Sequence, residues 1–251
     1  MNYFIHGDTH GSLSPINNFA YEHPGDGLII VGDYGLNYYG NSSDERRKAS
    51  VARLNINLFL IRGNHDKPHN ELVNAEKYYH PQIKGTVLRE SAYPNIFYLL
   101  DGETYEFNGK RTLILGGAYS VDKFYRLANN WNWFSGEQLS QEEMIEIYEK
   151  YQGQHFDLIL SHTCPYSWMP TDLFLSCIDQ SSVDNTMEHW MDDFRKVITF
   201  DGWVWGHYHD DRDSVDNDSP VSAENPHKIM LLHETISLEE VFSNKNIFSG
   251  E

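Results

Sequence analysis

Short polar motifs follow five apolar stretches of this chain, and they are built from residue types that bind metal ions. The plainest is Gly63-Asn64-His65-Asp66, just after the apolar run 58–61. A glycine lets the backbone turn sharply there, next to an amide oxygen, an imidazole and a carboxylate. Alone, the motif could equally be a polar turn, because Asn and Asp are ordinary turn residues.

Similar carboxylate or imidazole groups follow the apolar runs at 2–6, 27–31, 157–160 and 202–205. A single histidine after a strand is more often structural or solvated than a ligand, but five such motifs in one chain make coincidence improbable. Because sites in open α/β proteins usually lie at one edge of the sheet, we expect these side chains to converge. The residues collected in this way are Asp8, His10, Asp33, Asn64, His65, His162, His207 and His209.

This set combines carboxylate and amide oxygens with imidazole nitrogens. Such a mixture suits Mn²⁺, Fe or Zn²⁺ better than Ca²⁺ or a structural zinc–thiolate site. There are too many donors for one ion, whereas a carboxylate shared by two ions about 3.5–4 Å apart also holds a water or hydroxide between them. We therefore expect two divalent metal ions, with Mn²⁺ as the first choice and Fe or Zn²⁺ as alternatives.

The elements that must position these residues are predicted from periodicity and turn signals. Besides the five runs, we expect strands at 96–100, 104–107, 111–115 and 228–233, with a hairpin at Asn108-Gly109. Helices are expected from Ser12 or Ser14 before Pro15, over 44–54, from a capping box at Ser140 to residue 151, and over 183–197. Residues 37–43, 116–134 and 210–219 are expected to be loops. We expect a single α/β domain over residues 1–251.

Composition limits the class of protein. The chain carries 19 Lys and Arg against 37 Asp and Glu, a formal charge of −18. That charge disfavours extended nucleic-acid duplexes but not small anionic substrates, because bound cations reverse the field locally. Two cysteines are too few for a disulfide framework or a structural zinc site. With no leader and no apolar run long enough to cross a bilayer, a cytoplasmic protein without membrane partners is expected.

The motif set resembles that of the calcineurin-like metallophosphoesterases. All five blocks occur in that family's order: Gly7-Asp8-Thr9-His10-Gly11, Gly32-Asp33-Tyr34, Gly63-Asn64-His65-Asp66, Ser161-His162 and Gly206-His207-Tyr208-His209. The resemblance implies a four-layer α/β/β/α sandwich with two mixed sheets. It also implies that Asp8, His10 and His209 hold one ion, that Asn64, His162 and His207 hold the other, that Asp33 bridges them, and that His65 is the general acid.

The activity implied is hydrolysis of phosphate esters by a hydroxide held between the ions, with phosphomonoesters favoured. The alternatives are a phosphodiesterase or nuclease acting on short or cyclic nucleotides and, as a different class, a metal-binding module of this fold without catalysis. The second block lacks the Arg of the protein Ser/Thr phosphatases, and Asp66 stands where they usually carry Glu. The chain looks closer to the small bacterial and phage-type members, whose substrates range from small molecules and nucleotides to phosphoproteins.

Substrate contacts are expected outside the metal motifs. Lys123 and Arg126 lie in a basic and aromatic cluster with Trp131, Trp133 and Phe134, and a cation there could hold phosphate oxygens. Aromatic side chains mostly pack, however, and Lys and Arg are mostly solvated. Arg62 is a third candidate, although it could instead pair with a carboxylate inside the fold. The role of Asp66 is left open.

Overall fold

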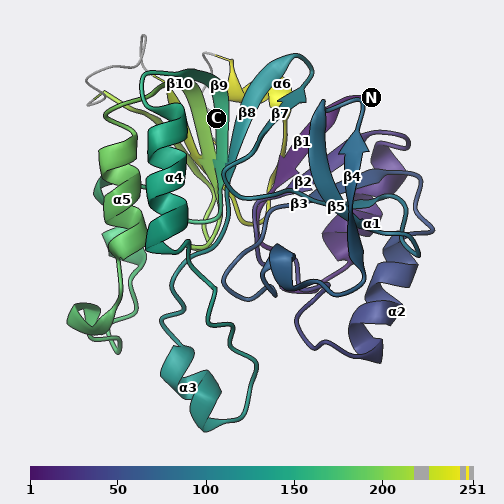
Figure 1. The fold of residues 1–251 in the computed structure, drawn as a ribbon, viewed down its shortest axis with the longest axis horizontal. Coiled ribbons are helices and arrows are strands. Elements are labelled where there is room, and N and C mark those ends of the chain that lie inside the picture. The colour runs from purple at the N-terminus through teal and green to yellow at the C-terminus, as the bar shows by residue number, and fades with distance from the viewer. Residues whose placement is uncertain (218–225, 244–246, 249–251) are drawn as a thin grey trace.

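The computed structural model describes residues 1–217, 226–243 and 247–248. Two β-sheets lie face to face, with α4 (Gln141–Tyr151) and α5 (Thr186–Phe194) outside one and α1 (Ser14–Glu22) and α2 (Ser42–Val51) outside the other (Figure 1). This is the four-layer arrangement expected from the sequence. None of the described helices is long and apolar enough to span a membrane.

The first sheet has seven strands in the order β13-β1-β2-β3-β6-β5-β4. Its centre is parallel and its margins are antiparallel, so the sheet is mixed. The strands are β1 (Tyr3–His6), β2 (Gly27–Ile30), β3 (Asn57–Leu60), β4 (Ala75–His80), β5 (Gly85–Glu90), β6 (Ile96–Tyr98) and β13 (Thr235–Ser237).

The second sheet has six strands in the order β11-β12-β10-β9-β8-β7 and is mixed in the same way. Its strands are β7 (Thr104–Phe107), β8 (Lys110–Leu115), β9 (His155–Ser161), β10 (Thr199–Trp205), β11 (Arg212–Val215) and β12 (His227–Met230). Two further α-helices are short, α3 (Lys123–Ala128) and α6 (Leu238–Val241).

The central strands carry apolar residues on both faces because both faces are buried. In β2, Ile29 packs between the two sheets, whereas Leu28 and Ile30 pack against α1 and α2. In β9, Leu160 faces the same inter-sheet core, whereas Ile159 faces α4 and α5. Successive side chains of a strand point to opposite faces, so each run fills two cores at once.

Several local predictions are confirmed. The hairpin turn has positive φ at both Asn108 (51°) and Gly109 (77°), as a type I′ turn requires. The capping box opens α4, with the Ser140 hydroxyl accepting from the Glu143 N–H and the Glu143 carboxylate accepting from the Ser140 N–H.

Two predictions need correction, and two strands were not predicted at all. Residues 116–134 are not all loop, because α3 forms within them on a segment with no helical apolar stripe. Within 210–219, the described residues include β11, an edge strand that pairs only with β12 and is largely polar. Residues 218–219 lie outside the described part. No strand was predicted for β4 or β5, whose sequences are mixed in polarity and partly exposed.

Candidate metal centre

Five loops from two sheets meet at one edge of the molecule, and they carry the eight residues singled out above. The loops follow β1, β2 and β3 in one sheet and β9 and β10 in the other. Register brings the strand ends level: His6 pairs with Ile30 and Ile30 with Leu60, while Leu160 pairs with Val204. The carboxyl ends of neighbouring parallel strands therefore present their loops together.

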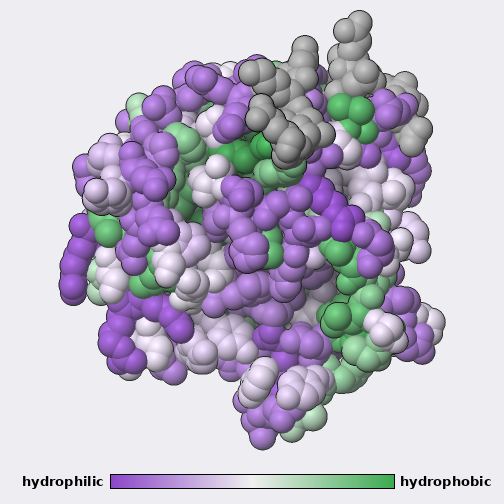
Figure 2. Space-filling view, turned by 180° about the vertical axis from the view of Figure 1, so that it is seen from behind, coloured by the Kyte–Doolittle hydropathy of each residue, from purple (hydrophilic) through white to green (hydrophobic). Residues whose placement is uncertain are grey.

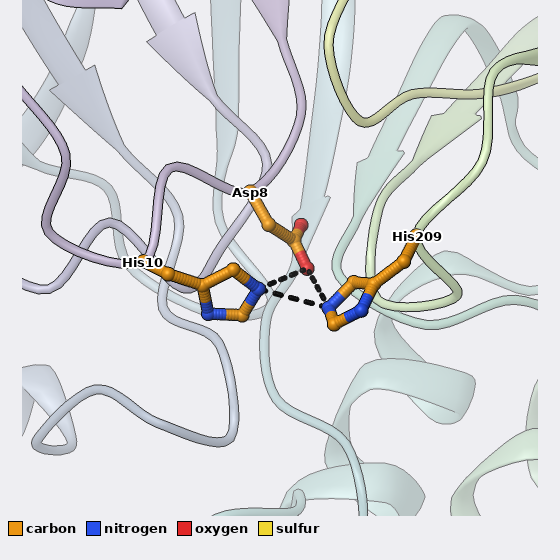
Figure 3. Close-up of side chains that lie close together, drawn as sticks. All are labelled: Asp8, His10 and His209. Carbon is orange, nitrogen blue, oxygen red and sulfur yellow. Dashed lines mark hydrogen bonds and ion pairs between the residues drawn. The ribbon is translucent and has the colours of Figure 1, made fainter. Parts of the chain in front are cut away.

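Asp8, His10 and His209 form one group of ligand atoms (Figure 3). The Nε2 atoms of the two histidines are 2.8 Å apart, and Asp8 Oδ2 is 3.8 Å from that of His10 and 3.6 Å from that of His209. Asp8 is buried, whereas the two imidazoles are partly exposed. Two nitrogens and one carboxylate oxygen thus face a common point near the surface.

A second group surrounds His162. Its Nδ1 lies 2.8 Å from the carbonyl oxygen of Val31, so Nδ1 carries the proton and Nε2 presents a lone pair. That Nε2 is 2.9 Å from Asn64 Oδ1 and 3.5 Å from Asp33 Oδ1. Asn64 is oriented by its own amide N–H, which donates to Ser120 Oγ at 2.8 Å. Three acceptor atoms therefore face one another with no proton between them, and a cation would fit this arrangement.

Asp33 lies between the two groups. Its Oδ1 faces His162, while its Oδ2 is 3.8 Å from Nδ1 of His10 and 3.8 Å from Nδ1 of His65. The position of His65 is itself tied to this carboxylate, because the His65 backbone N–H donates to Asp33 Oδ1 at 2.8 Å. The two oxygens of one carboxylate thus point to opposite sides of the site.

His207 is placed differently from the other predicted ligands. Its ring centroid is 5.0 Å from that of His162, and its backbone N–H lies 3.1 Å from each carboxylate oxygen of Asp8. Its ring nitrogens are not among the groups of ligand atoms described above. The structure therefore brings the side chain to the site beside His162 and shows the backbone of the same residue holding Asp8.

The electrostatics of the site favour a bound cation. Burial and the nearby carboxylates of Asp8 and Asp66 raise the pKa of Asp33. Burial lowers the pKa of His207 to about 3, and burial also lowers that of His162. Neutral imidazoles are the form that binds metals, and a cation would offset the repulsion among the buried carboxylates.

The backbone is strained or crowded where these groups meet. His10, Asp33, His207 and His209 all have positive φ (46°, 46°, 70° and 60°), which residues other than glycine rarely adopt outside functional or tightly held sites. A Cβ on Gly63 would lie 2.0 Å from Asp33 Oδ1, and one on Gly206 would lie 2.2 Å from Asp8 Oδ1. Glycine is required at these two positions because a carboxylate fills the space.

Asp66 is fully buried and holds two of the loops together. Its carboxylate accepts hydrogen bonds from the backbone N–H groups of Gly63 (2.9 Å), Tyr34 (3.2 Å) and Gly35 (3.0 Å). The turn that carries Asp33 is therefore fixed to the turn that carries Asn64. The sequence places Asp66 inside the motif, but nothing in the sequence indicated its three backbone partners. No sequence pattern indicated Ser120 as the partner of Asn64 either.

Arg126, on α3, brings a guanidinium to the site. Its Nη2 lies 2.7 Å from both ring nitrogens of His65, its Nε donates to Asp122 at 2.7 Å and its Nη1 to the Tyr38 hydroxyl at 3.1 Å. Burial, followed by the charge of Arg126, lowers the pKa of His65 to about 2. The imidazole is therefore neutral in this arrangement.

The other two candidate substrate contacts lie elsewhere. Arg62 is buried, pairs with Asp101 and donates to the carbonyls of Gly136 (2.8 Å) and Glu137 (3.0 Å), which is the internal role that the sequence left open. Lys123 Nζ lies 4.1 Å from the centroid of the Trp133 ring, a cation–π contact within the α3 segment. Neither side chain has a described contact with the predicted ligands.

A model of the calcineurin-like phosphoesterase family matches residues 1–211. The matched span contains every predicted ligand, from Asp8 to His209, together with His65, Asp66 and Arg126. A search of curated proteins gave no match. Since the family model covers 211 of the 251 residues, including all five motifs whose side chains meet at this site, the chain belongs to the calcineurin-like phosphoesterase family.

Proposed function

We propose that this phosphoesterase hydrolyses phosphate monoesters at a centre of two divalent cations, with Mn²⁺ the first choice and Fe or Zn²⁺ the alternatives. Asp8, His10 and His209 would hold one ion and Asn64, His162 and His207 the other, with Asp33 between them. The observation that carries the proposal is the set of facing lone pairs at His162 Nε2, Asn64 Oδ1 and Asp33 Oδ1. Bound divalent ions would neutralise phosphate oxygens and lower the pKa of water from about 16 towards 7.

His65 and Arg126 would act on the substrate itself. A bound phosphate dianion next to His65 would offset the charge of Arg126 and raise the pKa of the imidazole, which could then supply the proton to the leaving oxygen. Arg126 is held by Asp122 and Tyr38 with its Nη2 towards the site, so it is preorganised to donate to a non-bridging phosphate oxygen.

The same guanidinium favours monoesters over diesters. A monoester is a dianion at neutral pH and a diester a monoanion, so an extra fixed cation stabilises the monoester more strongly. The alternative is a diesterase or nuclease acting on short or cyclic nucleotides. A diester would bring only one negative charge to the site, so Arg126 would have no second phosphate charge to pair with. We therefore place small phosphomonoesters first among the substrates.

The test is hydrolysis of p-nitrophenyl phosphate and bis-p-nitrophenyl phosphate by Mn²⁺-loaded protein. We expect turnover of both, with the larger kcat/KM for the monoester. A larger value for the diester would favour the alternative activity. Absence of any turnover in a sample shown by elemental analysis to contain Mn²⁺ would refute the proposed function and leave a metal-binding module.

The His65→Ala variant tests whether His65 is the general acid or a metal ligand. We expect this variant to keep its metal content and to lose about 10²–10⁴-fold in kcat, the range typical of a general acid. Loss of the metal from His65→Ala would place His65 among the ligands instead.

A further inference from the structure

An apolar pocket of about 370 Å³ opens beside the candidate metal centre. His207, Tyr208 and His209 form one wall, so the pocket is continuous with the site. Other lining residues are Tyr119 and Val121, ahead of α3, and several residues of the segment between β9 and α5. Figure 2 shows hydrophobic side chains gathered on this side of the molecule, beside the projection that carries α3.

The walls of the pocket are mainly apolar and offer few groups that could pair with a charged occupant. The segment between β9 and α5 contributes its apolar side chains to the pocket: Met169, Leu173, Phe174, Leu175, Ile178 and Val183. Among the described residues that line the pocket, none is Lys or Arg, and the acidic Glu188 is only 3% exposed and bound to Thr163 Oγ1 at 2.9 Å. Phe174 and Tyr208 lie with their rings nearly parallel (21°), 6.4 Å apart between centroids.

We propose that this pocket receives the organic part of the substrate, so that the preferred substrates are phosphate esters of bulky, uncharged, apolar alcohols, especially aromatic ones. This inference rests on the proposed function, because a phosphate bound at the metal centre, to which His207 and His209 belong, would have its ester group next to this pocket. A monoester has one organic group, which must then be the leaving group. Each buried apolar carbon of that group adds to binding, as in other hydrophobic specificity pockets.

A matched pair of substrates tests the pocket. Phenyl phosphate and 4-tert-butylphenyl phosphate release phenols of similar acidity and differ mainly in apolar bulk. We expect kcat/KM to be about 10-fold or more higher for the tert-butyl ester, since added apolar groups in a hydrophobic pocket are typically worth that factor. Equal values for the two esters would overturn the inference while leaving the proposed function intact. Turnover of neither ester by Mn²⁺-loaded protein would instead refute the proposed function.

Two isoleucines provide the variant and its control. Ile178 lines the pocket, whereas Ile145 is 57% exposed on α4. Ile178→Asp should reduce the ratio of the two kcat/KM values to about one, and Ile145→Asp should keep the wild-type ratio. Leu175→Asp, at a lining side chain that is 61% exposed, repeats the test should Ile178→Asp fold poorly.

Binding without turnover gives an independent readout. Saturation-transfer NMR should show contact between the tert-butyl protons of 4-tert-butylphenol and the wild-type protein, with the signal lost in Ile178→Asp and kept in Ile145→Asp. The same signal in all three proteins would place the phenol elsewhere and contradict the proposal.

Discussion

We expect His69 to couple the stability of the protein to pH through a contact with the loop that carries Asp33. The side chain is buried, with Nδ1 2.7 Å from the carbonyl oxygen of Leu99 and Nε2 3.1 Å from the hydroxyl of Tyr34. Nδ1 donates to this carbonyl, so in the neutral imidazole Nε2 accepts a hydrogen bond from the Tyr34 hydroxyl. Tyr34 directly follows Asp33, so this hydrogen bond supports the turn that carries the proposed bridging carboxylate.

The size of the effect follows from the pKa. Burial lowers the pKa of His69 from 6.5 to about 4. As pH falls below 6.5 the unfolded chain binds a proton at this residue before the folded chain does, so the unfolded state is favoured. The contribution of the neutral His69 side chain to the stability of the fold is fully present above pH 6.5 and is lost as the pH falls towards 4. At about 1.4 kcal/mol per pH unit, the loss reaches about 3 kcal/mol.

The assay is urea unfolding of wild type and His69→Gln at several pH values between 4 and 8. Glutamine can donate to Leu99 and accept from Tyr34 but does not titrate, so we expect the difference in unfolding free energy between the two proteins to shrink by about 3 kcal/mol from pH 7 to pH 4. His155→Gln, on the exposed first residue of β9, controls for the substitution. A pH-independent difference between wild type and His69→Gln would refute the reasoning.

Two further substitutions test Asp66 and Arg126, whose partners in the fold the sequence did not reveal. Asp66→Ala leaves three buried N–H groups without an acceptor, so we expect a loss of roughly 3 kcal/mol or more in unfolding free energy and weaker Mn²⁺ binding, measured by urea unfolding and by titration calorimetry. The control is Tyr105→Phe, which removes both hydrogen bonds of a buried tyrosine on a strand with no proposed ligand and should destabilise the fold without changing Mn²⁺ affinity. If Asp66→Ala also left the Mn²⁺ affinity unchanged, the proposed role of Asp66 would be contradicted. Arg126→Met should lower kcat/KM for p-nitrophenyl phosphate by about 10- to 100-fold, the worth of one charge-assisted hydrogen bond, and by less for the diester. Equal losses on the two esters would remove the argument for monoester preference.

The loops that carry the proposed ligands could be predicted because each motif lies next to its strand in the sequence. Each motif directly follows a run such as 58–61 or 202–205 whose apolar character predicts a buried strand, and the motifs contain the glycines that the close packing requires. Convergence of the loops then follows from the rule that parallel strands end together. The two mixed sheets were predicted from the family resemblance rather than from periodicity.

What the sequence did not reveal depends on contacts between distant residues. Arg126 is 61 positions from His65, and only the course of the chain through α3 brings them together. The N–H donors to Asp66 at Tyr34 and Gly35 are 32 and 31 positions away. The strands β4 and β5 were missed because pairing with each other and with β6, rather than apolar alternation, makes them strands.

Counting bound ions tests the central claim most directly. After dialysis against Mn²⁺, elemental analysis of the wild-type protein should find two ions per chain. Asp33→Asn should lose both, because the one carboxylate faces His162 on one side and His10 on the other. Less than one ion per wild-type chain, or an Asp33→Asn variant that still binds two, would contradict the account.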